Sequence, residues 1–317
     1  MDEATLIRYI KNIGRGKNAA SDLSRDDARS LFTAVLGGLV PDLQLGAVLI
    51  ALRIKGESLE ELAGFAAACE ASYNHLTALS DGSVPVVIPT YNGARHLPNL
   101  VPLLGLLLAR EGIPVLIHGV TRDPGRVSTR EVLDALGIPA AMTGDEARER
   151  LGTTRFAFMP IEALAPEVAA TLALRAKLGL RNSAHTLVKM LQPFAGPAVR
   201  IVSVTHPEYL VRMREYFTTY DSDALLLRGA EGEAVAHPRR EPALDWAHDG
   251  RTETWNVETP SDQAALELPA DREAQTTARW IEGALEGRHP IPAPIVHQVE
   301  CCVRAARMLS VDSENQA

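Results

Sequence analysis

The sequence predicts an α/β protein with a small N-terminal helical lobe, residues 1–78, and a larger α/β lobe, residues 79–317, built on a mostly parallel sheet. The first lobe is predicted from four consecutive segments with helical periodicity or helix-capping signals. The second is predicted because short apolar runs alternate with helical segments from Val84 onward, as in sheets whose strands are joined by right-handed crossovers. Helices between about 161 and 192 interrupt this alternation, and the sequence leaves open whether they pack on the first lobe.

The N-terminal helices carry clear start signals. Ser24 and Ser58 stand where N-cap residues are expected, and each is followed three residues later by an acidic residue, as in a capping box. The segment 42–55 has apolar residues almost all round, so we expect it to be buried. Because a small lobe cannot bury such a helix alone, the same segment predicts a homodimer contact.

The second lobe contains five apolar runs with the length and composition of strands. These runs are Val86–Ile88, Val115–Ile117, Phe156–Met159, Val199–Val204 and Ala224–Arg228. The polar, proline-containing region Pro238–Glu267 predicts short antiparallel strands or loops, and Thr276–Leu285 and Ile295–Leu309 are predicted helices.

The loop after the first predicted strand is a candidate binding site. It reads PTYNG, Pro89–Gly93, and is followed by an apolar helix over 97–110. Such a loop lies at the carboxyl edge of a parallel sheet, where open α/β proteins place their ligands. Asn92 and Gly93 fit an anion-binding turn, and an ordinary tight turn explains them equally well.

Charge is unevenly distributed along the chain. The net charge is −8, and residues 241–317 hold 14 acidic and 6 basic residues, so the rest of the chain is neutral overall. No carboxylate occurs between Glu167 and Glu208, although this window contains five lysines and arginines. A neutral average can therefore hide basic surfaces beside an acidic tail.

Two groups of cations are candidates for contacts with nucleic-acid phosphates. The simpler alternative for both groups is an ordinary solvated face. The candidates are Arg8, Lys11, Arg15 and Lys17 near the N-terminus, and Arg175, Lys177, Arg181 and Lys189 in the acid-free window.

Several functional classes lack their sequence signals. The three cysteines, two of them adjacent, do not have zinc-ligand spacing and are expected to be reduced thiols. We find neither a nucleotide P-loop nor the residue order of a Ser-His-Asp triad. There is no apolar run of bilayer length, and the acidic N-terminus has no signal-peptide core. We therefore expect a cytoplasmic protein without membrane contact.

Three segments together resemble the anthranilate phosphoribosyltransferase family, relatives of the pyrimidine nucleoside phosphorylases. They are GAVLIALRIKGESLEELAGFAAA at 46–68, His118-Gly119 followed by the helix signal at 128–137, and LGLR at 178–181 followed by Pro193. The resemblance covers most of the chain. It implies a helical lobe joined to an α/β lobe of the phosphoribosyltransferase or nucleoside phosphorylase type, and a homodimer formed through the helices.

The catalytic motifs depart from that family. Its glycine-rich GTGGD loop is matched here by Pro89–Arg95, where bulky residues stand and the aspartate is missing. Its Lys-His-Gly-Asn-Arg motif is matched by IHGVT at 117–121, without the lysine and the asparagine. Its adjacent Asp-Glu pair for magnesium is matched only by the separated Glu231 and Glu233. The family's chemistry needs phosphate and metal contacts, so these losses argue against phosphoribosyl transfer.

The losses are similar to those of a divergent, YbiB-like branch of the family, which implies a DNA-binding protein without marked sequence specificity and without a cofactor. The alternative is a phosphoribosyl or glycosyl transferase with an altered site, which would need Mg²⁺. We name no catalytic residue. The residues expected around an anion or ligand pocket are Asn92, Gly93, Arg95, His118, Arg181, Asn182, Ser183 and His185.

Overall fold

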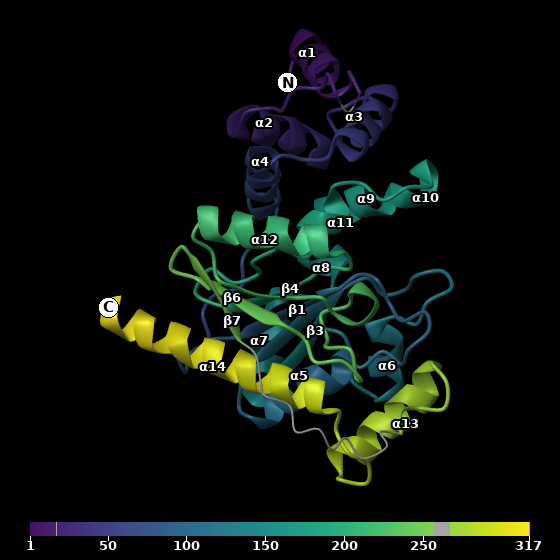
Figure 1. Ribbon diagram of the computed structural model, residues 1–317, viewed down its shortest axis with the longest axis vertical. Coiled ribbons are helices and arrows are strands. Elements are labelled where there is room, and N and C mark those ends of the chain that lie inside the picture. The colour runs from purple at the N-terminus through teal and green to yellow at the C-terminus, as the bar shows by residue number, and fades with distance from the viewer. Residues whose placement is uncertain (17, 256–266, 317) are drawn as a thin grey trace. The chain divides into compact units, whose positions relative to one another are not determined.

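The contacts of the chain divide it into two compact units. The computed structural model describes residues 1–16, 18–255 and 267–316 (Figure 1). Unit 1 comprises Met1–Asn74 and Ile161–Leu191, and unit 2 comprises His75–Pro160 and Gln192–Ala317. The segment 161–191 therefore belongs to the same unit as the N-terminal helices.

Unit 1 is entirely helical in its described residues. Its helices are α1 (Glu3–Ile13), α2 (Arg25–Leu36), α3 (Asp42–Lys55), α4 (Leu59–Glu70), α8 (Ile161–Leu164), α9 (Pro166–Ala173), α10 (Arg175–Leu178) and α11 (Ala184–Leu187). Helices α2 and α4 pack closely, with the rings of Phe32 and Phe65 stacked at 4.8 Å. Gly64 permits this approach, since a Cβ there would lie 2.3 Å from the carbonyl oxygen of Arg25. Helix α9 contacts α2, and α11 contacts α4.

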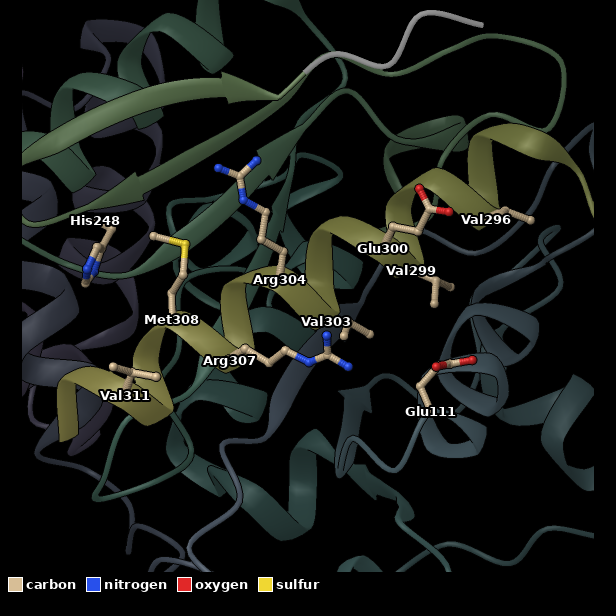
Figure 2. Close-up of a pocket in the computed structure, with 10 residues that line it drawn as sticks. All are labelled: Glu111, His248, Val296, Val299, Glu300, Val303, Arg304, Arg307, Met308 and Val311. Carbon is tan, nitrogen blue, oxygen red and sulfur yellow. The ribbon is translucent and has the colours of Figure 1, made fainter. Parts of the chain in front are cut away.

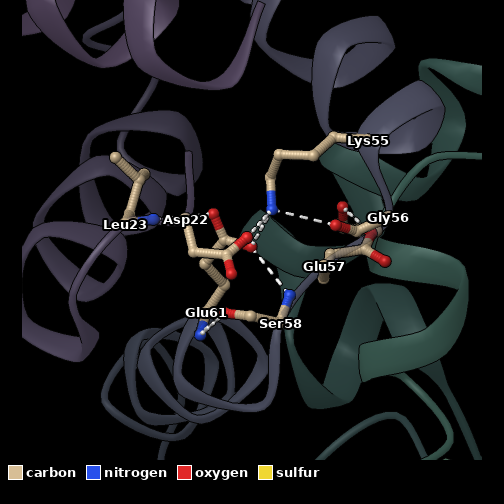
Figure 3. A network of polar contacts seen from close by, with 8 residues as sticks. Asp22, Leu23, Lys55, Gly56, Glu57, Ser58 and Glu61 are labelled. Carbon is tan, nitrogen blue, oxygen red and sulfur yellow. Dashed lines mark hydrogen bonds and ion pairs between the residues drawn. The ribbon is translucent and has the colours of Figure 1, made fainter. Parts of the chain in front are cut away.

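The predicted caps form, and one of them is part of a buried ionic network. Ser58 and Glu61 make the full capping box, whereas Ser24 accepts a hydrogen bond from the Asp27 amide. Glu61 is fully buried and pairs with Lys55 at 2.6 Å (Figure 3). A carboxylate removed from water needs such partners. The network holds the α3–α4 junction in place.

Helix α3 is only half buried within a single chain, so the prediction that it is fully buried was wrong for the single chain. Val48, Leu49 and Leu52 are buried, whereas Leu43 and Ile54 are 87% and 59% exposed. One apolar side of the helix is buried against neighbouring helices, and the opposite apolar side is exposed. Unit 1 supplies too few neighbours to surround the helix. The expected homodimer through this side stays a prediction.

Replacing Leu43 and Ile54 together with aspartate is expected to convert a dimer into a monomer. The exposed side chains contribute little to the fold of one chain, but two buried aspartates would be left uncompensated at an interface. Light scattering at micromolar concentration measures the mass. Val211→Asp, at a 60% exposed position outside unit 1, is the control and should remain dimeric. If the parent protein itself is monomeric, the prediction of a homodimer is wrong.

Unit 2 is built on a seven-stranded sheet with the order β3-β2-β1-β4-β5-β6-β7. The first five strands along the chain are parallel, and β6 and β7 are antiparallel. The mostly parallel sheet is therefore confirmed. Its strands are β1 (Val86–Thr90), β2 (Val115–Gly119), β3 (Phe156–Pro160), β4 (Val199–Ser203), β5 (Ala224–Leu227), β6 (Leu244–His248) and β7 (Arg251–Trp255).

Helices cover both faces of this sheet (Figure 1). Helices α5, α6, α13 and α14 contact one another beneath it, and α12 packs on β5, β6 and β7. Their bounds are α5 (Val101–Arg110), α6 (Thr129–Ala135), α7 (Gly144–Thr153), α12 (Pro207–Thr219), α13 (Ala274–Leu285) and α14 (Ala293–Gln316), with a 3-10 turn, η1 (Ala230–Gly232). The helix expected over 97–110 begins later, at Val101, and the part of 238–267 beyond Trp255 lies mainly outside the described residues.

Candidate functional site

The loop after β1 is held by a carboxylate from a distant part of the chain. Glu233 follows η1, and its Oε1 accepts hydrogen bonds from the backbone amides of Asn92, at 2.7 Å, and Gly93. Gly93 has a φ of 65°, a left-handed conformation that suits glycine. Both loop residues are buried. The turn that was expected to bind an anion therefore already binds one, the carboxylate of Glu233, through its backbone amides.

A second carboxylate accepts from three amides farther along the same loop, beyond Ala94, whose own amide donates to the carbonyl oxygen of Val127. Glu231 binds the N–H groups of Arg95 at 2.8 Å, His96 at 3.0 Å and Leu97 at 3.3 Å. The backbone of Glu231 is itself left-handed, with a φ of 52°. Its carbonyl oxygen accepts from the side-chain amide of Asn92 at 3.3 Å. Consecutive amides that point at one anion form the arrangement known as a nest.

His118 at the end of β2 is buried and uncharged. Its Nδ1 lies 2.7 Å from the hydroxyl of Tyr91, and its side chain is 1% exposed. Burial lowers the pKa of His118 to about 3, because a charged imidazole would lose its hydration. At neutral pH this histidine therefore supplies no positive charge for a phosphate.

Three arginines lie close to His185 in unit 1. Burial lowers the pKa of His185 to about 4, and the positive charges of Arg181, Arg175 and Arg53 add to that effect. Arg53 lies near the end of α3 and is exposed, whereas Arg175 begins the short α10 and Arg181 follows it. The three guanidinium groups thus contribute a positive potential at this histidine. Arg53 was not predicted from the sequence, since its segment is more than a hundred residues away from the other two.

The polar residues beside this arginine group hold the chain locally. Asn182 donates to the carbonyl oxygen of Thr171 at 3.0 Å and accepts from the amide of Ala184 at 3.0 Å. Ser183 donates to the carboxylate of Glu57. These bonds fix the turn that carries Arg181. The expected pocket residues therefore form two groups, Asn92, Gly93, Arg95 and His118 in unit 2, and Arg181, Asn182, Ser183 and His185 in unit 1.

Two of the N-terminal cations, Arg8 and Lys11, lie on the exposed side of α1, and Arg15 follows the end of that helix at Ile13. Arg8, Lys11 and Arg15 are exposed, and the guanidinium of Arg8 lies 4.0 Å from the carboxylate of Asp27. An ion pair as exposed as this one contributes little stability. Lys17 lies outside the described residues.

Two lysines complete the second group of cations. Lys177 is exposed on α10, and Lys189 is half-buried. Lys189 follows His185 by four residues, a spacing that predicts one shared helix face, but this prediction was wrong: α11 ends at Leu187 and Lys189 lies in the turn after it. Sequence spacing alone placed these two side chains on one face, and the short helix removes that relation.

A cavity of unit 2 lies elsewhere. It has a volume of about 860 Å³ and runs along the outer side of α14 (Figure 2). Val296, Val299 and Val303 give it an apolar floor, with Arg304 and Arg307 on its sides. None of the expected site residues lines this groove.

The carboxylates that match the family's magnesium pair do not fit that role. Both oxygens of Glu231 and one oxygen of Glu233 accept from backbone amides, and Glu233 Oε2 is buried without a hydrogen-bond partner. Magnesium needs several tightly placed oxygens, which these engaged groups do not offer. Within the described part of the chain, no three His, Cys, Asp or Glu side chains are grouped to hold a metal. Over the same residues, the helices are too short or too polar to cross a bilayer.

Comparison with known proteins identifies the family. Residues 7–72 match the helical bundle domain of a glycosyl transferase family. YbiB of Escherichia coli strain K12 is 44% identical to this chain over 98% of its length and 97% of the relative. The chain belongs to the anthranilate phosphoribosyltransferase-like family, in its YbiB-like branch.

Enzymes of the family are more distant relatives. Anthranilate phosphoribosyltransferase of Sinorhizobium medicae is 31% identical over 68% of this chain and 63% of the enzyme. The fold of the Thermus thermophilus enzyme superposes with a TM-score of 0.75, over 97% of this chain and 89% of that one, at 21% identity. The yeast enzyme in complex with PRPP and Mg gives a TM-score of 0.73, over 96% of this chain and 90% of that one, at 16% identity. These likenesses establish the fold.

Proposed function

We propose that this protein binds nucleic acid, with DNA as the expected form, through phosphate contacts that carry no sequence information. The observation that carries the proposal is the group of three arginines around His185, whose charges help to lower the pKa of that histidine to about 4. A positive potential is what a polyanionic backbone requires of its binding surface. Arginine also suits phosphate because its planar guanidinium can donate two parallel hydrogen bonds.

The exposed cations of α1 belong to the same unit and add to this support. Arg8 and Lys11 project from α1, Arg15 lies just beyond its end, and α1 packs on the helix that carries Arg53. Lys17, Lys177 and Lys189 remain in the proposed set. A homodimer would present each group twice, and repeated weak contacts raise the overall affinity. The proposal requires no cofactor, and the expected location is the cytoplasm.

A phosphoribosyl or glycosyl transferase is the second candidate, because enzymes of that kind are relatives of this chain. Such a reaction depends on groups that stabilise the charge of the departing pyrophosphate. In this chain Glu231 and Glu233 are bound to the loop amides, and the low pKa of His118, about 3, leaves it neutral. The binding function therefore has the stronger support.

Two assays on one preparation separate these candidates. Titration with labelled single- and double-stranded DNA of two unrelated sequences is expected to give similar affinities for both sequences. Transfer from phosphoribosyl pyrophosphate to anthranilate, with Mg²⁺ added, is expected to stay at background. Steady turnover that is abolished by Glu231→Gln, together with no binding of either DNA, would reverse the order of the two candidates.

A further inference from the structure

We infer that Glu231 and Glu233 fill an anion-binding site of the loop 91–97 from within the chain, so that phosphate groups are excluded from it. Five amides of this loop donate to the two carboxylates. Amides arranged in this way bind phosphates as readily as carboxylates. The site is therefore formed, but its ligand is a pair of side chains.

The segment that carries the two carboxylates is fixed in place by its own contacts. The Gly229 amide donates to the hydroxyl of Ser203 at 3.2 Å, and the Ala230 amide donates to the carbonyl oxygen of Val235 at 2.7 Å. A Cβ at Gly232 would meet the side-chain nitrogen of Asn92 at 2.1 Å. This packing holds Glu231 at its left-handed φ of 52°, which non-glycine residues seldom adopt. The carboxylates thus belong to a rigid turn that is pressed against the loop.

The charge of the two residues also acts against a second anion. Glu233 is 3% exposed, and its Oε2 has no hydrogen-bond partner, so this side chain is not neutralised by donors beyond the loop amides. A phosphate that approached the loop would meet two carboxylates at close range and would have to displace them from their amides. Both effects disfavour its binding. The inference does not depend on nucleic-acid binding by unit 1.

The variant Glu231→Gly tests this inference with pyrophosphate as the probe. Glycine keeps the left-handed backbone and removes the carboxylate that holds Arg95, His96 and Leu97. Calorimetry is expected to find no saturable binding to the parent protein at millimolar pyrophosphate. The variant is expected to bind at least about tenfold more tightly. Glu241→Gly removes one charge at an exposed position of the same unit and should behave as the parent.

Hydrogen exchange on the loop provides a second measurement, made on the parent protein and on two variants. The amides of 91–97 in the parent should be protected, and pyrophosphate should leave their exchange unchanged. In Glu231→Gly they should exchange faster and regain protection with pyrophosphate; Glu231→Gln, which keeps the side-chain shape, should lie between the two proteins. Binding of pyrophosphate to the parent loop would overturn the inference, as would a folded Glu231→Gly that binds no better than the parent.

Discussion

Replacing Arg53 and Arg181 together with glutamine is expected to weaken nucleic-acid binding by about two orders of magnitude at 0.1 M salt. Each phosphate contact contributes roughly 0.7 to 0.9 to the slope of log affinity against log salt. From 1 M down to 0.1 M salt, two contacts therefore supply about 1.4 to 1.8 decades of affinity, which the variant loses. The loss should be similar for unrelated sequences, since phosphates carry no base information. The slope itself should fall by about one to two units. Fluorescence anisotropy over a salt series measures both quantities.

The matched control removes two charges from the acid-rich part of unit 2. Arg279→Gln with Arg307→Gln changes exposed positions on α13 and α14 and should leave the affinity within about twofold of the parent. A structural readout accompanies the arginine variant. Because the two arginines help to lower the pKa of His185 to about 4, their removal should raise that pKa, which NMR titration detects. An unchanged affinity with a raised pKa would show that these cations serve only as a solvated face.

Acid is expected to destabilise unit 2 by about 3 kcal/mol between pH 7 and pH 4.5 through His118 alone. Burial lowers the pKa of His118 to about 3 in the folded chain, against an ordinary value of 6.5. Below pH 6.5 the His118 side chain therefore binds a proton in the unfolded chain but stays neutral in the folded chain until the pH approaches 3. The contribution of the neutral His118 to the free energy of unfolding is complete above pH 6.5, and it is lost as the pH falls from about 6.5 towards 3. One unit of pKa shift corresponds to about 1.4 kcal/mol, which sets the magnitude.

His118→Gln isolates this contribution, because glutamine can still bond to the hydroxyl of Tyr91 and does not titrate. Urea unfolding followed by tryptophan fluorescence reports on unit 2, since Trp246, Trp255 and Trp280 all lie in that unit. The variant should be less sensitive to acid than the parent by about 3 kcal/mol over this range. Equal acid sensitivity in the two proteins would mean that His118 is protonated in the folded chain.

The five parallel strands of unit 2 could be predicted from the sequence because each is a short, mostly apolar run bounded by breakers. Phe156–Pro160 and Val199–Ser203 lie within one residue of their predicted bounds. Two helices were not predicted. Helix α7 buries only Ala147 and Leu151, which is too sparse a stripe to stand out in a polar segment. Helix α12 begins at Pro207 and buries Leu210, Met213 and Phe217 at helical spacing, so its signal is present in the sequence.

The parts of the candidate site that depend on distant contacts could not be predicted. The sequence indicated that Glu231 and Glu233 differ from a magnesium pair, but not that they accept from amides more than 130 residues away. Only the folded sheet brings η1 to the loop after β1. Arg53 was missed for the same reason, because its place near His185 is set by the packing of α11 and α9 on the N-terminal helices. Local patterns determine helices and strands, whereas sites join residues that no local pattern connects.

The most direct test of nucleic-acid binding is a titration of the parent protein with labelled single- and double-stranded DNA at two salt concentrations. The proposed phosphate contacts predict binding to unrelated sequences with similar affinity and a steep loss of affinity from low to physiological salt. An affinity that does not change with salt, or no binding at low salt, would contradict the proposed function.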